Sequence, residues 1–331
     1  MDLLQSKREH VAFLRRYHEQ KMKKNGNSAP SNTPPLPSNN TRVDSTTVNL
    51  SSAEVLHIGK DFLDSSPPAA KRDPVIATMV TSQTSKYLKC LQYFLLSLEA
   101  TGYNSEVLIL IADNPDSLKR SFSNIPNQPY LGKLTIPYEG NLILKEIYAP
   151  TIEVTNHFDE GSRKYSKTLT KLHLWALHTY SYVVYYDLDF IFLKNPIPAA
   201  TIACSTTNSN LCATMDEGMV KYFGRPAGRY FNSGFMVLKP SIATYNNLLL
   251  KKSWAESKQF PDQDYLNEAF ENNWGKLSEE FNRMHISNIN LKHVHGGGIN
   301  SHTVALHEKY WVLRDTFPDP NYIWNKIKLR K

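Results

Sequence analysis

The sequence predicts an α/β protein with a Rossmann-like, mostly parallel sheet, and three stretches lead to this prediction. The runs VIATMV, after Pro74, and EVLILIA, over Glu106–Ala112, are short and apolar, as buried strands are. Between them, Tyr87–Ala100 places its leucines on one helical stripe. Because a strand, a helix and a second strand form a right-handed parallel crossover, these stretches predict two parallel strands.

A second apolar run precedes a pair of carboxylates. Within Ser181–Lys194, the residues Val183–Tyr186 predict a central strand that is buried on both faces. Asp187 and Asp189 follow directly. In an extended segment, residues i and i+2 point to the same side, so both carboxylates could bind one hard divalent cation, Mg²⁺ or Mn²⁺. An Asp-x-Asp match alone is common in solvated turns.

The rest of the predicted elements follow in chain order. They are an outer strand or two over Asn141–Ile152, a helix over Thr168–Tyr180, a strand over Tyr230–Lys239, helices over Ile242–Gln259 and Gln263–Asn272, and a strand over Asn290–Val294. Residues 200–230 predict an irregular loop region, either over a site or as a plain surface excursion.

Composition indicates a soluble globular protein, with 41% hydrophobic and 21% charged residues among 331. No apolar run approaches the length of a membrane span, and charge near the N-terminus argues against an export signal. Cys90, Cys204 and Cys212 lack zinc-type spacing and predict reduced thiols. We therefore expect a cytoplasmic location, where sequons at Asn39 and Asn49 would have no role.

The first 72 residues differ from the rest. Residues 1–24 predict a basic amphipathic helix that docks on a partner, on an anionic membrane surface or on its own domain. Residues 25–52 are rich in Asn, Ser, Thr and Pro and predict a disordered linker. The predicted division is therefore 1–72, with helix and linker, and 73–331, with the α/β domain.

The formal net charge of +7 admits two explanations. It could indicate nucleic-acid binding, but the basic residues gather at Lys7–Lys24 and Lys326–Lys331 and are not interleaved with aromatic residues. The net positive charge is equally consistent with a substrate that carries a negatively charged diphosphate. We expect no nucleic-acid partner.

Six stretches in order resemble the glycogenin-like members of glycosyltransferase family 8, from about residue 74 to about residue 311. They are IATMVTS, LTKLHLW, YYDLD, FNSGFMVLKPS, DQDYLN and HGGG. The resemblance implies a GT-A fold, with a mixed, mostly parallel sheet and helices on both faces. It also implies a retaining enzyme that uses a UDP-sugar and Mn²⁺, with Mg²⁺ as the alternative.

The resemblance assigns the metal to Asp187, Asp189 and His295. An imidazole beside carboxylates suits Mn²⁺, although a lone histidine is more often structural. His302 and His307 compete with His295 for the metal.

The chain departs from the family pattern after this histidine. Gly298 matches the family glycine near the diphosphate, but the family lysine falls on Ser301, next to His302. Either Lys309 takes the diphosphate or this contact has changed.

The resemblance also assigns residues to the sugar and the nucleotide. Lys171 would contact the sugar or diphosphate, and Asp262 and Gln263 would lie beside the anomeric carbon. Asn232, Ser233 and Asp216 would line the sugar pocket. Thr81, Ser82 and Tyr87 would hold the uridine, and Leu188 and Gly234 are further implied contacts. Spacing alone equally allows Thr81 and Ser82 to be a helix cap, and Tyr87 an ordinary aromatic residue at a helix start.

The implied reaction moves a hexose, glucose or galactose, to a protein-linked glycan or hydroxyl acceptor, by front-face attack or through a covalent intermediate. Asp262 could be the nucleophile, stabilise the sugar cation or position another group. Self-glucosylation, for which 18 tyrosines leave room, and non-catalytic UDP-sugar binding are the alternatives. Family members often dimerise, so a homodimer is possible.

Overall fold

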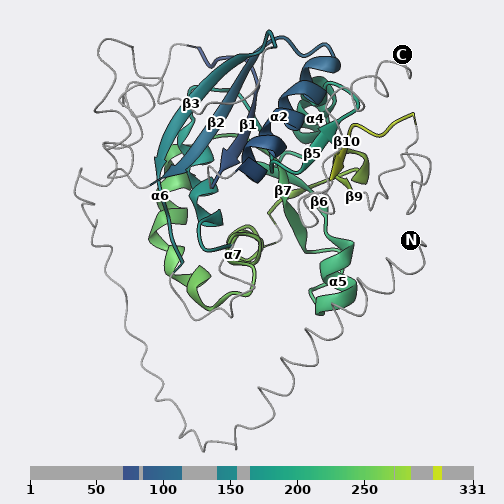
Figure 1. Cartoon of the computed structure of the whole chain (residues 1–331). Coiled ribbons are helices and arrows are strands. Elements are labelled where there is room, and N and C mark those ends of the chain that lie inside the picture. The colour runs from purple at the N-terminus through teal and green to yellow at the C-terminus, as the bar shows by residue number, and fades with distance from the viewer. Residues whose placement is uncertain are drawn as a thin grey trace, which may run out of the picture. The chain divides into compact units, whose positions relative to one another are not determined.

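The computed structural model describes residues 70–81, 85–113, 140–154, 165–271, 273–284 and 301–307 (Figure 1). All of them belong to the second of two compact units, Val55–Lys331. The helix predicted over residues 1–24 and the linker over 25–52 lie outside the described residues. The predicted domain boundary therefore stays a prediction.

A seven-stranded sheet forms the centre of this unit, in the order β3-β2-β1-β4-β7-β6-β8. Its strands are β1 (Val75–Val80), β2 (Glu106–Asp113), β3 (Ile143–Pro150), β4 (Val183–Tyr186), β6 (Leu211–Met215), β7 (Phe231–Leu238) and β8 (Gly275–Leu277). β1 pairs with β2 and β4 in parallel, whereas β7 is antiparallel to both β4 and β6. The predicted mixed, mostly parallel sheet of the GT-A class is confirmed.

Helices cover both faces of the sheet, as predicted (Figure 1). The 3₁₀ helix η3 (Thr168–Ala176) and helices α6 (Ile242–Leu250) and α7 (Pro261–Ala269) pack on one face, and α2 (Ser85–Ala100) and α4 (Pro196–Thr206) pack on the other. Successive side chains of β4 point to opposite faces of the sheet, so Val183 and Tyr185 lie in one core and Val184 and Tyr186 in the other. This is why the strand is apolar throughout.

A smaller sheet lies beside the end of β4. β5 (Phe190–Phe192) pairs with β10 (Ala305–His307), which also pairs with β9 (Arg283–Met284). In this register His307 is opposite Phe190. The pairing therefore brings a histidine from near the end of the described chain next to Asp189.

Several predicted elements differ from the structure. The predicted loop over residues 200–230 is wrong, because it contains the end of α4, strand β6 and helix α5 (Glu217–Phe223). The helix predicted over Thr168–Tyr180 is a 3₁₀ helix that ends at Ala176, and the one predicted over Ile242–Gln259 divides into α6 and η4 (Lys252–Ser257). The strand predicted over Asn290–Val294 lies outside the described residues. Among the helices that are described, none is long and apolar enough to span a bilayer.

The prediction of reduced thiols is wrong for two of the three cysteines. Cys204, near the end of α4, forms a disulfide with Cys212 in β6, and both are fully buried. The third, Cys90, is free and buried in α2. Sequence spacing could not show this pairing because it depends on how α4 packs against the sheet.

Candidate functional site

The two predicted metal-binding carboxylates lie in the short connection between β4 and β5. The backbone N–H of Asp187 donates to the carbonyl of Gly234 at 2.8 Å, which joins the connection to β7. Leu188 is buried, and Leu188 and Asp189 form a turn rather than an extended segment. The i, i+2 argument therefore does not apply here, and each carboxylate has partners of its own.

One carboxylate oxygen of Asp187 is bound by buried groups, but the side chain is also partly exposed to solvent. Its Oδ1 accepts a hydrogen bond from the Tyr185 hydroxyl at 2.5 Å and lies 3.4 Å from the Nζ of Lys171. The Asp187 side chain is nevertheless 37% exposed, against 2% for that of Lys171. The carboxylate thus joins the buried charge to the surface, where a charged ligand can reach it.

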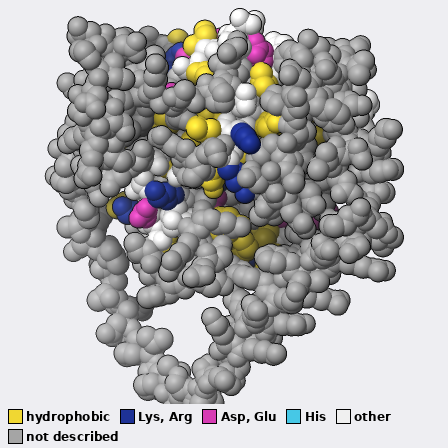
Figure 2. Space-filling model, in the orientation of Figure 1, with side chains coloured by type: hydrophobic (Ala, Val, Ile, Leu, Met, Phe, Trp, Pro, Cys, Tyr) yellow, Lys and Arg dark blue, Asp and Glu magenta, His cyan; other side chains and the backbone are white. Residues whose placement is uncertain are grey.

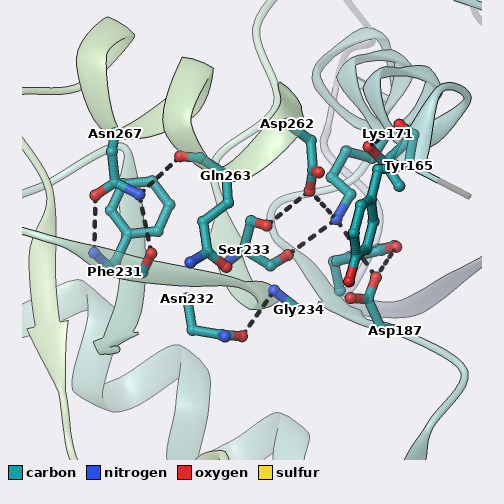
Figure 3. A network of polar contacts seen from close by, with 12 residues as sticks. Tyr165, Lys171, Asp187, Phe231, Asn232, Ser233, Gly234, Asp262, Gln263 and Asn267 are labelled. Atoms are coloured by element: carbon teal, nitrogen blue, oxygen red, sulfur yellow. Dashed lines mark hydrogen bonds and ion pairs between the residues drawn. The ribbon is translucent and has the colours of Figure 1, made fainter. Parts of the chain in front are cut away.

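Lys171 is the buried cation of the site (Figure 3). Its Nζ lies 2.6 Å from Asp262 Oδ2 and 3.3 Å from the carbonyl of Ser233. Burial lowers the pKa of Lys171, but Asp187 and Asp262 outweigh burial and raise it above its ordinary value. The ammonium therefore remains charged in the neutral range.

Asp262 is the second buried partner of Lys171, at the first turn of α7. Burial raises the pKa of Asp262, but the charge of Lys171 and hydrogen bonds from Lys171, Ser233 and Thr168 bring it below its ordinary value. The Ser233 hydroxyl donates to its Oδ2 at 2.7 Å. Asp262 is thus an ionised carboxylate whose Oδ2 is already bound by Lys171 and Ser233.

A second group of polar side chains joins α5, β7 and α7. Asp216 caps α5 by accepting from the N–H of Met219, and its other oxygen accepts from Asn232 at 2.8 Å and Gln263 at 3.0 Å. The Oε1 of Gln263 accepts from the N–H of Ser233 at 3.2 Å. The structure therefore brings together the residues that the resemblance assigned to the sugar.

Gly234 permits the close approach of these two groups. A Cβ at this position would lie 2.9 Å from Asp187 Oδ2 and 2.9 Å from Asn232 Oδ1. Both contacts are too short for a side-chain carbon. Only glycine allows β7 to pass this close to both carboxylate and amide.

Asp189 faces a histidine that the sequence left as one of three candidates. Its Oδ2 lies 3.2 Å from the Nε2 of His307, which is buried and stacks on the ring of Phe190. The Nδ1 of His307 lies 3.1 Å from the Oδ1 of Asn282. Among the described residues, no three His, Cys, Asp or Glu side chains converge as a complete metal site.

The predicted nucleotide-binding residues are described in part. Thr81 follows β1, and Tyr87 lies in the first turns of α2. Burial raises the pKa of Tyr87, a hydrogen bond with Thr81 lowers it, and the negative charges of Asp189 and Asp187 raise it further. Tyr87 is therefore close enough to Asp187 and Asp189 for their charges to affect it.

Four predicted site residues, Ser82, His295, Gly298 and Lys309, lie outside the described residues. The two alternatives for the diphosphate contact, Ser301 and His302, are exposed in a turn before β10. The carbonyl of Ser301 accepts a hydrogen bond from Lys194.

Three further residues of this region were missed by sequence reasoning. Asn267 binds both the N–H and the carbonyl of Phe231, at 2.8 and 2.9 Å, and so joins α7 to β7 (Figure 3). Its place four residues after Gln263, on one helix face, was a usable signal. Tyr185, two residues before Asp187, also had a usable signal, since residues i and i+2 of a strand lie on the same face. Asn282 had none, because its contacts depend on long-range packing.

Comparison with known proteins was made against families, curated relatives and solved structures. The model of the family "Glycosyl transferase family 8" matches residues 106–307, more than half of the chain. The chain belongs to this family. The match includes β2, the Asp187–Asp189 connection, β7, α7 and His307, so the site residues described above, except Thr81 and Tyr87, lie within the matched residues.

The curated relatives match over limited stretches. Glycogenin-1 of Oryctolagus cuniculus is 38% identical over 107 residues, which are 32% of this chain and 28% of that protein. Galactinol synthase 2 of Ajuga reptans is 25% identical over 217 residues, 58% of this chain and 72% of that protein. Putative UDP-glucuronate:xylan alpha-glucuronosyltransferase 5 of Arabidopsis thaliana is 33% identical, over 35% of this chain and 17% of that protein. The chain therefore spans less than a third of the glycogenin and the xylan enzyme.

Solved structures are similar at lower identity. An active-site mutant of LgtC covers 78% of this chain and 95% of its own, with 17% identity and a TM-score of 0.47. The glycosyltransferase GlyE of Streptococcus pneumoniae covers 79% of this chain and 64% of its own, with 15% identity and a TM-score of 0.44.

Proposed function

We propose that this chain is a retaining glycosyltransferase that moves a hexose from a UDP-sugar to a protein-linked glycan or a hydroxyl acceptor, with Mn²⁺ as cofactor. The observation that supports this most is the buried Lys171 between Asp187 and Asp262, in a chain that belongs to family 8. Burying a charge is costly unless an opposite charge compensates it, and here two carboxylates compensate one buried ammonium. Such a group is typical of a site that handles a charged substrate.

The charge balance of the site supports a divalent cation. Asp187 and Asp262 share the ammonium of Lys171, and Asp189 lies beside the imidazole of His307, so the three carboxylates outnumber the ammonium by two. A nucleoside diphosphate is itself an anion and would be repelled by this set. A divalent cation at the exposed side of Asp187 removes the repulsion and provides the diphosphate with a partner.

The donor atoms of this region fit manganese. A carboxylate oxygen of Asp189 and the Nε2 of His307 face each other at 3.2 Å, and carboxylate with imidazole is a suitable donor set for Mn²⁺. We propose Asp189 and His307 as ligands, with Asp187 approaching when the ion binds, because the three side chains do not converge as a complete site in the structure. The assignment of His295 stays a prediction. When bound, the ion would supply Lewis-acid stabilisation of the diphosphate leaving group.

Lys171 and Asp262 have separate roles in this proposal. As the glycosyl–phosphate bond breaks, negative charge grows on UDP, and the fixed ammonium of Lys171 stabilises it without reorganisation. Asp262 keeps this ammonium in place and ionised, since its Oδ2 is already bound by Lys171 and by Ser233. Because Oδ2 is occupied by Lys171 and Ser233 and the side chain is buried, we favour a positioning role for Asp262 and front-face attack.

The sugar-side residues would select the donor. Asn232, Ser233, Gln263 and Asp216 form one hydrogen-bonded set whose donors and acceptors are fixed by each other. Fixed polar groups of this kind discriminate between hydroxyl patterns of sugars. Thr81, Ser82 and Tyr87 would hold the uridine, and Gly298 with Lys309 the diphosphate.

The distribution of charged side chains does not favour a nucleic-acid partner. Figure 2 shows Lys and Arg side chains beside Asp and Glu, and no continuous basic stripe among the described residues of this face. The absence of nucleic acid among the partners stays our prediction. A homodimer is likewise a prediction.

The disulfide weighs against the predicted cytoplasmic location. Disulfides persist in oxidising compartments and are rare where glutathione keeps thiols reduced. Because Cys204 and Cys212 are paired and buried, we propose that the chain matures in an oxidising compartment. There the sequons at Asn39 and Asn49 could be used.

Two measurements test the proposed function. Isothermal titration with UDP, with and without Mn²⁺, should show binding that depends on the metal; equal weak binding in both would contradict the proposal. The intact mass of the chain after incubation with UDP-glucose, UDP-galactose or UDP-glucuronate tests whether the chain is its own acceptor. Addition of whole hexose masses to the chain itself would favour the self-glucosylating alternative. The similarity to glycogenin-1 is the reason for considering this alternative. Metal-dependent UDP binding without any turnover, even to water, would favour the non-catalytic alternative.

A further inference from the structure

We infer that Asn282 is a positioning residue for the metal ligand His307 and links this ligand to the sugar-side residues. The inference rests on the proposed function, in which His307 binds the metal. Asn282 follows the short helix η5 (Glu279–Phe281), and no sequence motif marked it. It is buried, as is His307, so water does not compete for their contacts.

The orientation of the Asn282 amide can be derived from its neighbours. Asn232 Oδ1 accepts from the backbone N–H of Gly234 at 2.9 Å, and Asn232 Nδ2 donates to the carboxylate of Asp216 at 2.8 Å. A backbone N–H can only donate, so Oδ1 of Asn232 is the atom that faces Gly234 and the orientation of the Asn232 amide is fixed. Its Oδ1 therefore requires a donor from Asn282, at 3.0 Å.

This fixes Asn282 in turn. Its Nδ2 donates to Asn232 and to the hydroxyl of Thr214 at 3.1 Å, which uses both amide hydrogens. The remaining Oδ1, which can only accept, lies 3.1 Å from the Nδ1 of His307. Nδ1 must therefore carry a proton.

The consequence concerns the other nitrogen of His307. With a proton on Nδ1, the neutral ring has its lone pair on Nε2, and this atom faces Asp189 Oδ2 at 3.2 Å. A lone pair and a carboxylate repel unless Nε2 binds a proton or a metal ion. Asn282 thus selects the tautomer that can bind a metal, as the outer partners of histidine ligands do, and the stacked Phe190 ring fixes the plane of the imidazole.

The same hydrogen bonds continue to the sugar-side residues. From His307 they pass through Asn282 and Asn232 to Asp216, which also binds Gln263. The proposed metal ligand and the proposed sugar contacts are therefore parts of one buried chain of polar groups. A change at Asn282 should weaken metal binding directly and donor binding in addition.

The test measures Mn²⁺ affinity of the full chain from the electron paramagnetic resonance signal of free Mn²⁺, without substrate. Asn282→Leu should bind Mn²⁺ about 10–100-fold more weakly than wild type. Thr214→Val is the matched control, because it removes one contact of Asn282 and leaves those to His307 and Asn232; it should bind nearly as wild type does. Thermal unfolding checks that each variant is folded, and Asn282→Ser replaces the leucine variant if that one does not fold.

A double-mutant cycle separates a specific role from a general one. If Asn282 acts through His307, Asn282→Leu combined with His307→Ala should bind Mn²⁺ no more weakly than His307→Ala alone. Additive losses would overturn the inference, and so would Asn282 variants that bind Mn²⁺ as tightly as the wild type. In both cases, Mn²⁺ binding by the wild type would still support the metal site. Absence of Mn²⁺ binding by the wild type, with UDP present or absent, would overturn the metal site and the inference together.

Discussion

The Nζ of Lys171 lies 2.6 Å from Asp262 Oδ2, and both side chains are buried. One partner comes from η3 and the other from the first turn of α7, so this contact also joins two helical elements on the same face of the sheet. The pair is therefore part of the fold as well as of the proposed site.

The first prediction concerns the stability of this pair. Lys171→Met should lower the free energy of unfolding by about 3–5 kcal/mol, because it leaves Asp262 charged and buried without its cation. The double variant with Asp262→Asn should recover much of this loss, since no uncompensated charge remains. Urea unfolding measures both values. Losses that simply add would show that the two groups do not interact as described.

Activity should respond differently from stability. Both the single and the double variant should lose transfer activity by about 10²–10³-fold, because the ammonium that stabilises the leaving diphosphate is absent from each. Recovery of stability without recovery of activity would distinguish the catalytic role of Lys171 from its structural one. Full activity of the folded double variant would contradict that role.

A second prediction concerns Gly234. Gly234→Ala places a Cβ 2.9 Å from both Asp187 Oδ2 and Asn232 Oδ1, so one of these groups must move. Transfer activity should fall by about tenfold or more, as it does when reacting groups are misplaced by a fraction of an ångström. Steady-state kinetics with saturating donor measures this. In an Asp187→Asn background the same substitution should add little further loss.

The third prediction is a pH dependence of stability from His173. Its Nδ1 contacts the hydroxyl of Tyr245 at 2.7 Å and its Nε2 the carbonyl of Pro150 at 2.9 Å. Burial is the main reason why its pKa is lowered from 6.5 to about 4. Between these values the unfolded chain binds a proton that the folded chain does not, so stability should fall as the pH drops from 6.5 towards 4, by up to about 1.4 kcal/mol per pH unit.

Urea unfolding at pH 7, 6, 5 and 4 checks this dependence, with His173→Gln as control. The variant should lose the part of the pH dependence that belongs to His173, although it is less stable overall. A wild type and a variant with parallel pH profiles would rule out His173 as the source.

The fourth prediction concerns the cysteines. Titration of thiols in denaturant without reductant should find one thiol, that of Cys90, and three after reduction. Cys204→Ser should lower the free energy of unfolding by about 2–4 kcal/mol. Three thiols in unreduced protein from an oxidising compartment would contradict the disulfide.

The sequence predicted the main sheet well, and particular residues explain where it did not. Val183–Tyr186 and Phe235–Leu238 are buried on both faces, so their continuous apolar runs predict strands directly. β6 was missed because Leu211–Met215 is short and follows a run of Ser, Thr and Asn. Local patterns of that kind favour a loop, whereas the pairing of β6 with β7 and β8 decides the structure.

The site was predictable to the extent that neighbouring residues formed it. Asp262 with Gln263, and Asn232 with Ser233, follow from family motifs that are continuous in sequence. The contact of Asp189 with His307 depends on the pairing of β10 with β5, and that of His307 with Asn282 depends on β9 and η5. No local pattern encodes such a long-range pairing, so sequence reasoning left three histidines open and missed the asparagine.

The central claim is that a divalent cation at Asp187 and Asp189 serves the transfer of a hexose from a UDP-sugar. Its most direct test is the rate of UDP release from a panel of UDP-sugars, with Mn²⁺ and with chelator, in the wild type, Asp187→Asn and Asp189→Asn. We predict release by the wild type that requires Mn²⁺ and falls by about 10²–10³-fold or more in both folded variants. Release that is equally fast with chelator, or unchanged in either variant, would contradict the account.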